Sequence, residues 1–232
     1  MRTLCSGSDI VSKEMYTVST TSASDAKLLL RPELTASVVR IALENGWQYA
    51  LPKRVWYHGA LFRHERPQKG RFRQLSQKSA EFLGAPDVQG DLEILTSGLD
   101  LIKRVLGDQA PLDVQVNSIG DSECPRVFKT ELTAWLKTPQ TFSELEQHDQ
   151  DKVDSNPLRV LDSKHFQNHQ FYAEAPRLLK FLSGKSERTF EEIQVGLSGI
   201  GISYRVNPGL VGGWTTTTTS ASRSNLDTQA NH

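Results

Sequence analysis

The sequence predicts an α+β fold in which an antiparallel sheet is flanked by helices. The composition of the 232 residues, 37% hydrophobic and 23% charged, is close to that of an ordinary globular domain. Two long runs with strand character are joined by a short turn-rich loop and lie among amphipathic helices, which is typical of α+β rather than of doubly wound folds. No apolar run approaches the roughly 18 residues that a bilayer span requires, so the sequence excludes a membrane protein.

The first third of the chain is expected to hold a helix followed by a long hairpin. Residues 17–24 are rich in Ser and Thr and indicate a loop or hairpin tip. Gly46 is placed to end a helix whose apolar residues recur at helical spacing, namely Leu34, Val38 and Ile41. Residues 54–66 and 72–82 are predicted strands, and residues 67–70 between them have turn composition.

The rest of the chain alternates between helix and strand patterns. Gly107 closes a strongly amphipathic helix whose apolar stripe is Leu92, Leu95, Leu99, Ile102 and Leu106. Residues 112–116 alternate as a half-buried strand does, and residues 202–206 are a further predicted strand. A last helix, with Thr189 and Glu192 near its start, has the stripe Phe190, Ile193, Leu197 and Ile200. Gly199 and Gly201 are expected to end it.

The hairpin places charged and amide side chains on one sheet face. Side chains alternate along a strand, so Arg63 and Glu65 share a face, and Gln77 shares one with Glu81. Spacing alone leaves two interpretations open, a solvated face with surface ion pairs or a face turned toward a ligand. The connecting loop adds a cluster suited to binding phosphate, namely Arg66, Lys69, Arg71 and Arg73.

These residues carry a family resemblance. Residues 62–74, FRHERPQKGRFRQ, resemble motif 2 of the class II aminoacyl-tRNA synthetases, in the form used by histidyl-tRNA synthetases. Residues 30–36, LRPELTA, resemble the histidine-binding segment of the same family. Residues 9–16 and 156–164 are similar to further family stretches, and the resemblance runs from about residue 8 to residue 211. It favours the ligand-facing interpretation of the hairpin.

The resemblance implies a role for each matching residue. Four residues would bind histidine, with the last two holding its amino group and imidazole: Glu33, Thr35, Gln77 and Glu81. Three residues would bind ATP, with the first gripping the α-phosphate as the catalytic arginine and the second near the adenine: Arg63, Glu65 and Arg71. A fixed arginine suits the developing phosphate charge. Mg²⁺ would accompany ATP by bridging its phosphate oxygens.

The family also implies partners and a compartment. The intact relative would bind tRNA(His) and form a homodimer. Two cysteines, Cys5 and Cys124, are too few for a disulfide scaffold, and the N-terminus lacks an apolar signal core, so a cytoplasmic location is expected. No site at which protein side chains would bind a metal ion is predicted. His165 with His169, and the acidic run Asp149, Asp151 and Asp154, are interpreted as structural or solvated residues, and Cys124 as a small helix residue.

The sequence departs from the family at both ends. Most of motif 1 and all of motif 3 and the anticodon-binding domain have no counterpart, so residues 1–211 are interpreted as a partial catalytic domain. After Val211 the family reads Arg-Gly-Leu-Asp-Tyr-Tyr-Asn, whereas this chain reads Gly-Gly-Trp-Thr-Thr-Thr-Thr. Deleting one base from codons for the first peptide, CGG GGG TTG GAC TAC TAC AAC, yields the second. Residues 212–232 are therefore interpreted as a disordered, out-of-frame tail, against the alternative of a genuine Thr-rich linker.

Three functions are weighed. The first is a histidine–tRNA ligase core that forms histidyl-adenylate and charges tRNA, although this fragment is expected to be inactive. The second is the synthetase-like regulatory subunit of ATP phosphoribosyltransferase, which binds histidine without aminoacylation. The intact ATP-gripping residues favour the first. A nucleic-acid-binding module without chemistry is disfavoured because 27 basic residues balance 27 acidic ones.

Overall fold

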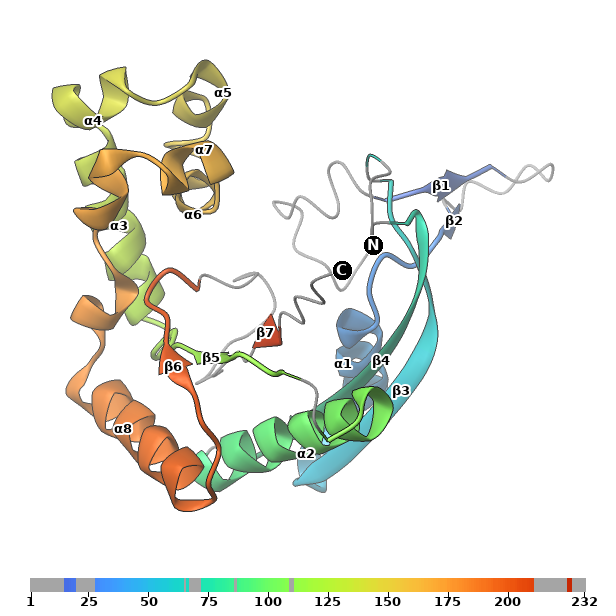
Figure 1. The fold of residues 1–232 in the computed structure, drawn as a ribbon. Helices are drawn as coiled ribbons and strands as arrows, with labels where there is room; N and C mark the ends of the chain where they lie inside the picture. The colour runs from blue at the N-terminus through green and yellow to red at the C-terminus, as the bar shows by residue number, and fades with distance from the viewer. Residues whose placement is uncertain are drawn as a thin grey trace. The chain divides into compact units, whose positions relative to one another are not determined.

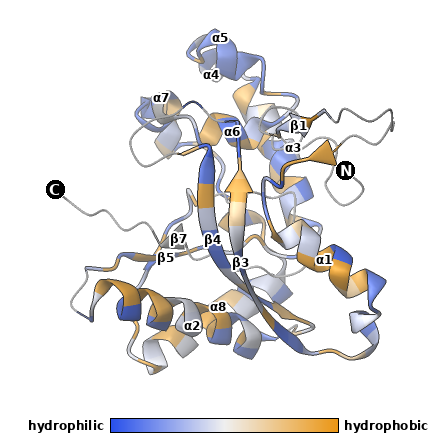
Figure 2. Cartoon of the chain, turned by 90° about the vertical axis from the view of Figure 1, so that its right-hand side faces the viewer, coloured by the Kyte–Doolittle hydropathy of each residue, from blue (hydrophilic) through white to orange (hydrophobic). Residues whose placement is uncertain are grey.

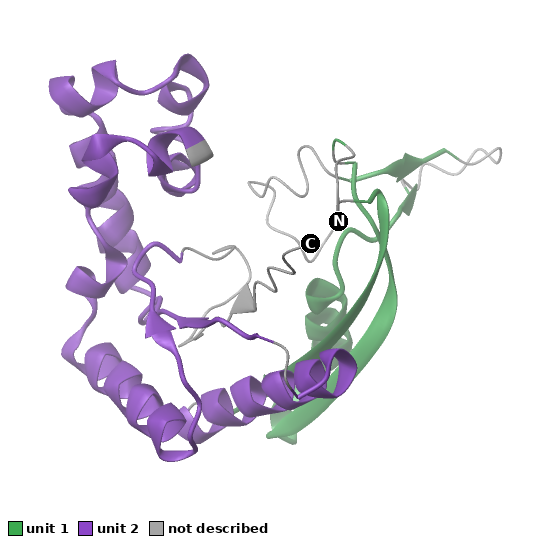
Figure 3. Ribbon diagram, viewed as in Figure 1, with its two compact units in different colours: residues 1–85 green, residues 86–232 purple. Residues whose placement is uncertain are grey.

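The computed structural model describes residues 15–19, 28–64, 66, 72–85, 87–108, 111–210 and 225–226. The chain divides into two compact units, residues 1–85 and residues 86–232, which Figure 3 shows in green and purple. Each unit has its own strands and helices, and together they confirm the α+β class that the sequence predicts.

The first unit is built on a long antiparallel hairpin (Figure 1). Strand β3 (Lys53–Phe62) pairs with strand β4 (Gln74–Leu83) over all ten residues of each. A short antiparallel pair joins β1 (Thr17–Val18) to β2 (Leu28–Leu29). Both predicted long strands are therefore present, but the first ends at Phe62 instead of Arg66. Among the described residues, one further backbone bond extends the ladder, from the N–H of Arg63 to the carbonyl of Arg73 at 2.9 Å.

The described part of this unit also contains helical segments. Helix α1 (Thr35–Glu44) buries Val38, and the short helix η2 (Trp47–Tyr49) follows it. Gly46, between the two, has a φ of 65°, a left-handed conformation that glycine adopts without the steric cost of a Cβ. The predicted helix and its glycine stop are both confirmed.

The second unit is mainly helical. Its longest helices are α2 (Val88–Leu106), α3 (Cys124–Leu136) and α8 (Gly184–Gly199). The short helices between α3 and α8 are α4 (Pro139–Ser143), α5 (Gln147–Gln150), α6 (Pro157–Leu161), α7 (Lys164–Gln167), η3 (Gln170–Ala173) and η4 (Leu178–Phe181). A three-stranded sheet has the order β6 (Arg205–Val206), β5 (Val114–Val116), β7 (Asn225–Leu226), with β5 parallel to β6 and antiparallel to β7.

Two hydrophobic clusters hold this unit together. One joins α2, α8 and β5, and its buried residues are Leu95, Leu99, Val114, Val116, Phe190, Ile193 and Leu197. Figure 2 shows that α2 and α8 each also carry hydrophilic residues, as amphipathic helices do. Gly196 lets the two helices approach closely, because a Cβ there would lie 2.4 Å from Leu92 Cδ1. The second cluster is centred on α3 and includes Phe128, Leu132 and Phe166.

Several sequence predictions in this unit are wrong in detail. Helix α8 begins at Gly184 and not near Thr189, because Ser183 caps it by accepting a hydrogen bond from the N–H of Ser186. Its polar first turn adds nothing to the apolar stripe, so the pattern does not reveal that turn. Of the strand predicted over residues 202–206, only Arg205–Val206 pairs as strand.

One side-chain interpretation is wrong, whereas that of His165 and His169 as structural or solvated residues is unchanged. Asp149 is fully buried, so it is not part of a solvated acidic run. Its Oδ1 atom lies 3.3 Å from Lys152 Nζ and 3.1 Å from His148 Nε2, which explains how a carboxylate is held there. His165 and His169 do not share a helix face, because α7 ends at Gln167. Each imidazole lies near the carboxylate of a glutamate from an earlier segment of the chain, which fits a structural role.

The tail prediction falls mostly outside the described residues. Residues 211–224 and 227–232 are not described, and Asn225–Leu226 forms the edge strand β7. The interpretation of residues 212–232 as an out-of-frame tail stays a prediction. Over the described part of the chain, each helix is too short or too polar to span a lipid bilayer.

Candidate active-site face on the hairpin

The β3–β4 hairpin has two chemically different faces. Its register pairs Tyr57 with Ser79 and Gly59 with Gln77, so odd-numbered residues of both strands share one face. Along most of the hairpin these odd-numbered residues are partly buried while their even-numbered neighbours are exposed. We call the odd-numbered side the inner face.

Of the predicted site residues of the hairpin, Arg63, Gln77 and Glu81 lie on this inner face. Gln77 and Glu81 are both on β4, two side chains apart on the same side. Arg63 directly follows β3, and its backbone bond to Arg73 continues the ladder, so alternation assigns it to the same side. Glu65 and Arg71 lie outside the described residues.

The segment before α1 runs against the end of β3. The N–H of Phe62 donates to the carbonyl of Arg31 at 2.9 Å, and Arg31 Nε donates to the carbonyl of Ala60 at 2.9 Å. Arg63 Nε donates to the carbonyl of Pro32 at 2.9 Å. These bonds bring the predicted histidine-binding segment, residues 30–36, to the same end of the hairpin as Arg63.

Glu33 has a structural partner at the start of α1. One of its carboxylate oxygens, Oε1, accepts a hydrogen bond from the N–H of Ala36 at 3.0 Å. The first-turn N–H groups of a helix lack partners within the helix, and the residue at the N-cap position, Leu34, cannot supply one. Glu33 therefore caps α1, and this bond fixes one of its carboxylate oxygens.

Glu81 accepts two hydrogen bonds on one oxygen. Tyr57 donates its hydroxyl to Glu81 Oε1 at 2.8 Å, and Thr35 donates its hydroxyl to the same oxygen at 3.0 Å. The Thr35 and Tyr57 hydroxyl oxygens are also 3.0 Å apart. Burial, followed by the neighbouring Glu81, raises the pKa of Tyr57 above its ordinary value of 10.0, so the phenol stays protonated near neutral pH.

Gln77 offers an unused acceptor. Its Nε2 donates to the hydroxyl of Ser79 at 2.9 Å. Its carbonyl oxygen, Oε1, is buried and has no hydrogen-bond partner among the described residues. A buried acceptor without a partner costs free energy unless a ligand fills it. With Glu81 on the same face, this part of the hairpin suits a ligand that carries N–H donors.

Sequence reasoning missed Tyr57 and Ser79. Both have the same parity as Gln77 and Glu81, so alternation along the two strands was the signal that could have found them. Thr35, which the resemblance assigns to the histidine substrate, here donates its hydroxyl to Glu81.

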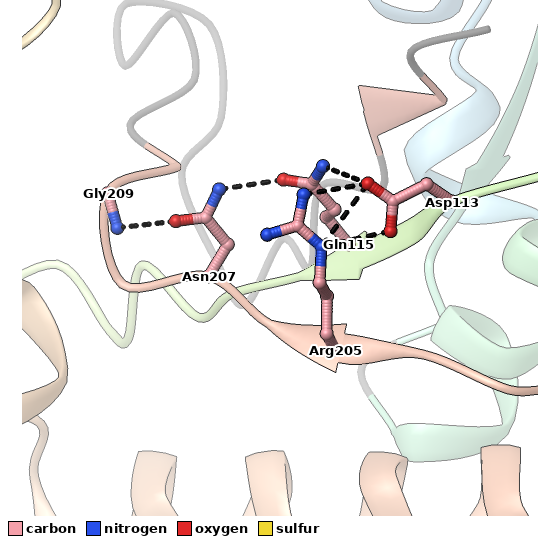
Figure 4. Close-up of polar contacts among 5 residues, drawn as sticks. All are labelled: Asp113, Gln115, Arg205, Asn207 and Gly209. Atoms are coloured by element: carbon pink, nitrogen blue, oxygen red, sulfur yellow. Dashed lines mark hydrogen bonds and ion pairs between the residues drawn. The ribbon is translucent and has the colours of Figure 1, made fainter. Parts of the chain in front are cut away.

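A second polar network lies on the sheet of the other unit (Figure 4). Arg205 on β6 forms an ion pair with Asp113 at 2.7 Å, and its hydrogen bonds lower the pKa of Asp113 to about 2. Gln115 donates to Asp113 at 2.6 Å and accepts from Asn207 Nδ2 at 2.7 Å. Asn207 Oδ1 accepts from the N–H of Gly209 at 2.9 Å, which shapes the turn after β6.

That turn is also held from β5. Asn117 is buried, and its Nδ2 donates to the carbonyl of Leu210 at 3.0 Å. The N–H of Asn207 donates to the carbonyl of Val116 at 3.0 Å. The two asparagines thus fix the backbone immediately before Val211.

The remaining sequence candidates are structural. Cys124 is buried at the start of α3, and its thiol donates to Asp121 Oδ1 at 3.2 Å and accepts from the N–H of Ser183 at 3.3 Å. In the described part of the chain, no three His, Cys, Asp or Glu side chains gather so that they could ligate a metal ion.

Comparison with known proteins identifies the family. The sequence model described as Histidyl-tRNA synthetase matches residues 1–197. The chain belongs to the histidyl-tRNA synthetase family. This confirms the resemblance carried by residues 62–74 and 30–36.

Curated relatives agree with this family membership. A histidine–tRNA ligase of Parasynechococcus marenigrum is 40% identical over 207 residues, covering 89% of this chain and 47% of the relative. A histidine–tRNA ligase of Thermosynechococcus vestitus is 42% identical over 206 residues, covering 88% of this chain and 47% of the relative. The chain thus spans about half the length of these histidyl-tRNA synthetase relatives.

Solved structures show the same fold. Apo histidyl-tRNA synthetase of S. aureus matches with a TM-score of 0.66 at 28% identity, over 90% of this chain and 47% of that one. A Bacillus halodurans protein titled ATP phosphoribosyltransferase regulatory subunit/histidyl-tRNA synthetase matches with a TM-score of 0.58 over 95% of this chain and 60% of that one. At 16% identity the second match supports the fold alone.

Proposed function

We propose that this chain carries the histidine-binding part of a histidine–tRNA ligase catalytic core. The observation that carries the proposal is the buried carbonyl oxygen of Gln77, which has no partner among the described residues and lies on the same face of β4 as the carboxylate of Glu81. Histidine presents N–H donors on both its ammonium and its imidazole. The amide oxygen and the carboxylate on one sheet face can accept hydrogen bonds from those donors. A ligand that carries only acceptors would leave both protein groups without a hydrogen bond.

The proposed reaction of the whole ligase has two steps. A carboxylate oxygen of histidine attacks the α-phosphorus of ATP, the bond to the β-phosphate bridge breaks, and pyrophosphate leaves, which gives histidyl-adenylate. A terminal ribose hydroxyl of tRNA(His) then attacks the carbonyl carbon, and AMP leaves. Arg63 would hold the α-phosphate, and Glu65 and Arg71 would contact ATP as the family resemblance implies. Mg²⁺ would enter with ATP, bound to its phosphate oxygens.

The geometry around Arg63 supports this division of roles. Its Nε bond to the carbonyl of Pro32 orients the guanidinium at the end of the inner face. A planar guanidinium that is held in advance binds phosphate oxygens with little reorganisation, which is what stabilisation of developing charge requires. The proposed ligase is a cytoplasmic homodimer that charges tRNA(His).

A regulatory histidine sensor is the competing function. The Bacillus halodurans title names such a subunit, but the identity of 16% supports only the shared fold. Identities of 40% and 42% to histidine–tRNA ligases favour the ligase. Retention of Arg63 and of the Arg-Pro-Gln-Lys-Gly-Arg loop points the same way, because a sensor of histidine has no need of ATP-binding groups.

Calorimetry with L-histidine tests the proposal. We expect the 232-residue chain to bind L-histidine, and Gln77→Ala to weaken that binding by about tenfold, since it removes a buried acceptor. Gln74→Ala is the matched control, because Gln74 lies on the exposed, even-numbered side of the same strand. Failure of the parent chain to bind, or an equal effect of the two variants, would refute the proposed histidine site.

A second titration separates the ligase from the sensor. In the presence of saturating histidine, Mg·ATP should bind the parent chain, and Arg63→Ala should weaken that binding. Histidine binding without any ATP binding would instead favour the regulatory function.

A further inference from the structure

We infer that Tyr57 is a positioning residue that fixes the Glu81 carboxylate so that its free oxygen selects ligands with a ring N–H. The inference rests on the proposed histidine site and goes beyond it, because neither the family resemblance nor the sequence pattern assigned Tyr57 a role.

The geometry begins with the three side chains that meet over β3 and β4. Tyr57 is on β3, Glu81 is on β4, and Thr35 is the first residue of α1. The hydroxyl groups of Tyr57 and Thr35 lie 2.8 Å and 3.0 Å from the same oxygen, Glu81 Oε1. The two hydroxyl oxygens are also 3.0 Å apart, so the three side chains form one hydrogen-bonded cluster around that oxygen. Two donors from two different elements therefore fix the rotation of one carboxylate.

The second oxygen of Glu81 is left for a ligand. Oε2 accepts no hydrogen bond from the described residues, whereas Oε1 accepts two. A carboxylate whose one oxygen is saturated presents the other oxygen in a set direction. That oxygen can only accept, so it favours a ligand with an N–H at that point and disfavours an isostere without one.

The protonation of Tyr57 keeps this arrangement in place. Burial raises the pKa of the phenol, and so does the hydrogen bond to Glu81. Because the pKa is raised above 10.0, the hydroxyl remains a donor throughout the physiological pH range. Loss of the hydroxyl would leave Thr35 as the only described donor to Oε1, and the carboxylate could then rotate.

The test compares two ligands of similar shape. L-histidine has a ring N–H, and the amino acid in which a thiazole replaces the imidazole has none. In calorimetric titrations of the 232-residue chain, Tyr57→Phe should weaken binding of L-histidine by about tenfold, the lower range for a hydrogen bond to a charged group. Binding of the thiazole analogue should change by less than about twofold. The preference for histidine should therefore fall by about tenfold.

Controls distinguish positioning from a general structural role. Tyr49→Phe makes the same chemical change on a side chain that is 88% exposed, and it should leave both affinities unchanged. Thr35→Ser keeps the second donor and should keep the preference. If Tyr57→Phe does not fold by circular dichroism, Thr35→Val, which removes the other donor to Oε1, should show the same loss of preference.

A spectroscopic measurement checks the contact itself. In an ultraviolet titration, with Tyr57→Phe used to assign the signal, Glu81→Gln should lower the pKa of the Tyr57 phenol, because the anion that raises it is removed. Equal weakening of both ligands by Tyr57→Phe, or an unchanged preference, would overturn the positioning role while leaving the histidine site standing. A parent chain that binds both ligands equally would instead refute the proposed histidine site, and the role of Tyr57 with it.

Discussion

Asp121 links the starts of two helices in the second unit, and removing its carboxylate should destabilise the fold measurably. Its Oδ1 accepts from the N–H groups of Glu123 at 3.0 Å and of Cys124 at 3.2 Å, at the start of α3. Its Oδ2 accepts from the hydroxyl of Ser183 at 2.6 Å, and Ser183 caps α8. One side chain therefore serves two helix starts, and it reaches the second through Ser183, 62 residues further along the chain.

The expected cost of Asp121→Ala is about 2 kcal/mol of unfolding free energy. A lost helix cap typically costs about 1 kcal/mol. The partly buried Ser183 hydroxyl would also lose its charged acceptor and keep only the Ser186 hydroxyl at 3.0 Å, which costs about 1 kcal/mol more. Because the two effects share one carboxylate, the Asp121→Ala and Ser183→Ala changes should couple, with a cycle energy of about 1 kcal/mol.

Urea unfolding followed by far-ultraviolet circular dichroism measures this cost. Asp108→Ala is the matched control, because Asp108 is exposed beyond the end of α2, and it should change stability by less than about 0.5 kcal/mol. The hydrogen bond from Ser183, and then that from Cys124, hold the pKa of Asp121 well below its ordinary 3.8. The stabilisation is therefore complete above pH 3.8 and is lost as the pH falls toward the lowered value. A cost for Asp121→Ala no larger than that of the control, or strictly additive changes in the cycle, would refute this reasoning.

Three other outcomes are expected. Arg205→Ala should raise the pKa of Asp113 from about 2 toward 3.8, because the hydrogen bond from Arg205 contributes most to lowering it. A carboxyl NMR titration that shows no rise would contradict the ion pair. In pyrophosphate exchange the 232-residue chain should be inactive, because Gly212 stands where the family has an arginine. Loss of such a transition-state donor typically costs about 10²–10³ in rate. Robust exchange, or a nucleotide sequence with an intact reading frame at codon 212, would count against the out-of-frame tail. Exposed aromatic side chains, such as Tyr49 at 88% and Trp56 at 79%, should promote association, and a monodisperse monomer in light scattering would contradict that.

The hairpin was predictable because alternation follows directly from strand geometry. Once residues 54–66 and 72–82 read as strands, the parity of Gln77 and Glu81 followed without any tertiary information. The helices that show a long apolar stripe, α2 above all, were predictable for a similar reason, since the stripe reports the face that packs.

The missed features depend on contacts between segments distant in sequence. The Tyr57–Glu81 bond depends on the strand register, and its companion from Thr35 depends on where α1 begins. The burial of Asp149 depends on the packing of the short helices around it, so local composition suggested the opposite. Ser183 was missed as the start of α8 because its partners include Asp121, from far upstream in the chain.

Two asparagines hold the turn after β6, so residues upstream of the turn set the path of the backbone that leads into it. Asn117 holds the carbonyl of Leu210, and Asn207 holds the N–H of Gly209 and is itself held to Val116, so the path of the backbone up to Leu210 is specified from upstream. A change of reading frame that begins at residue 212 would alter the residues that follow, with exceptions such as Gly213, yet leave these bonds intact. The turn up to Leu210 can therefore form in the same way whether the ribosome reads the family's peptide or the threonine run.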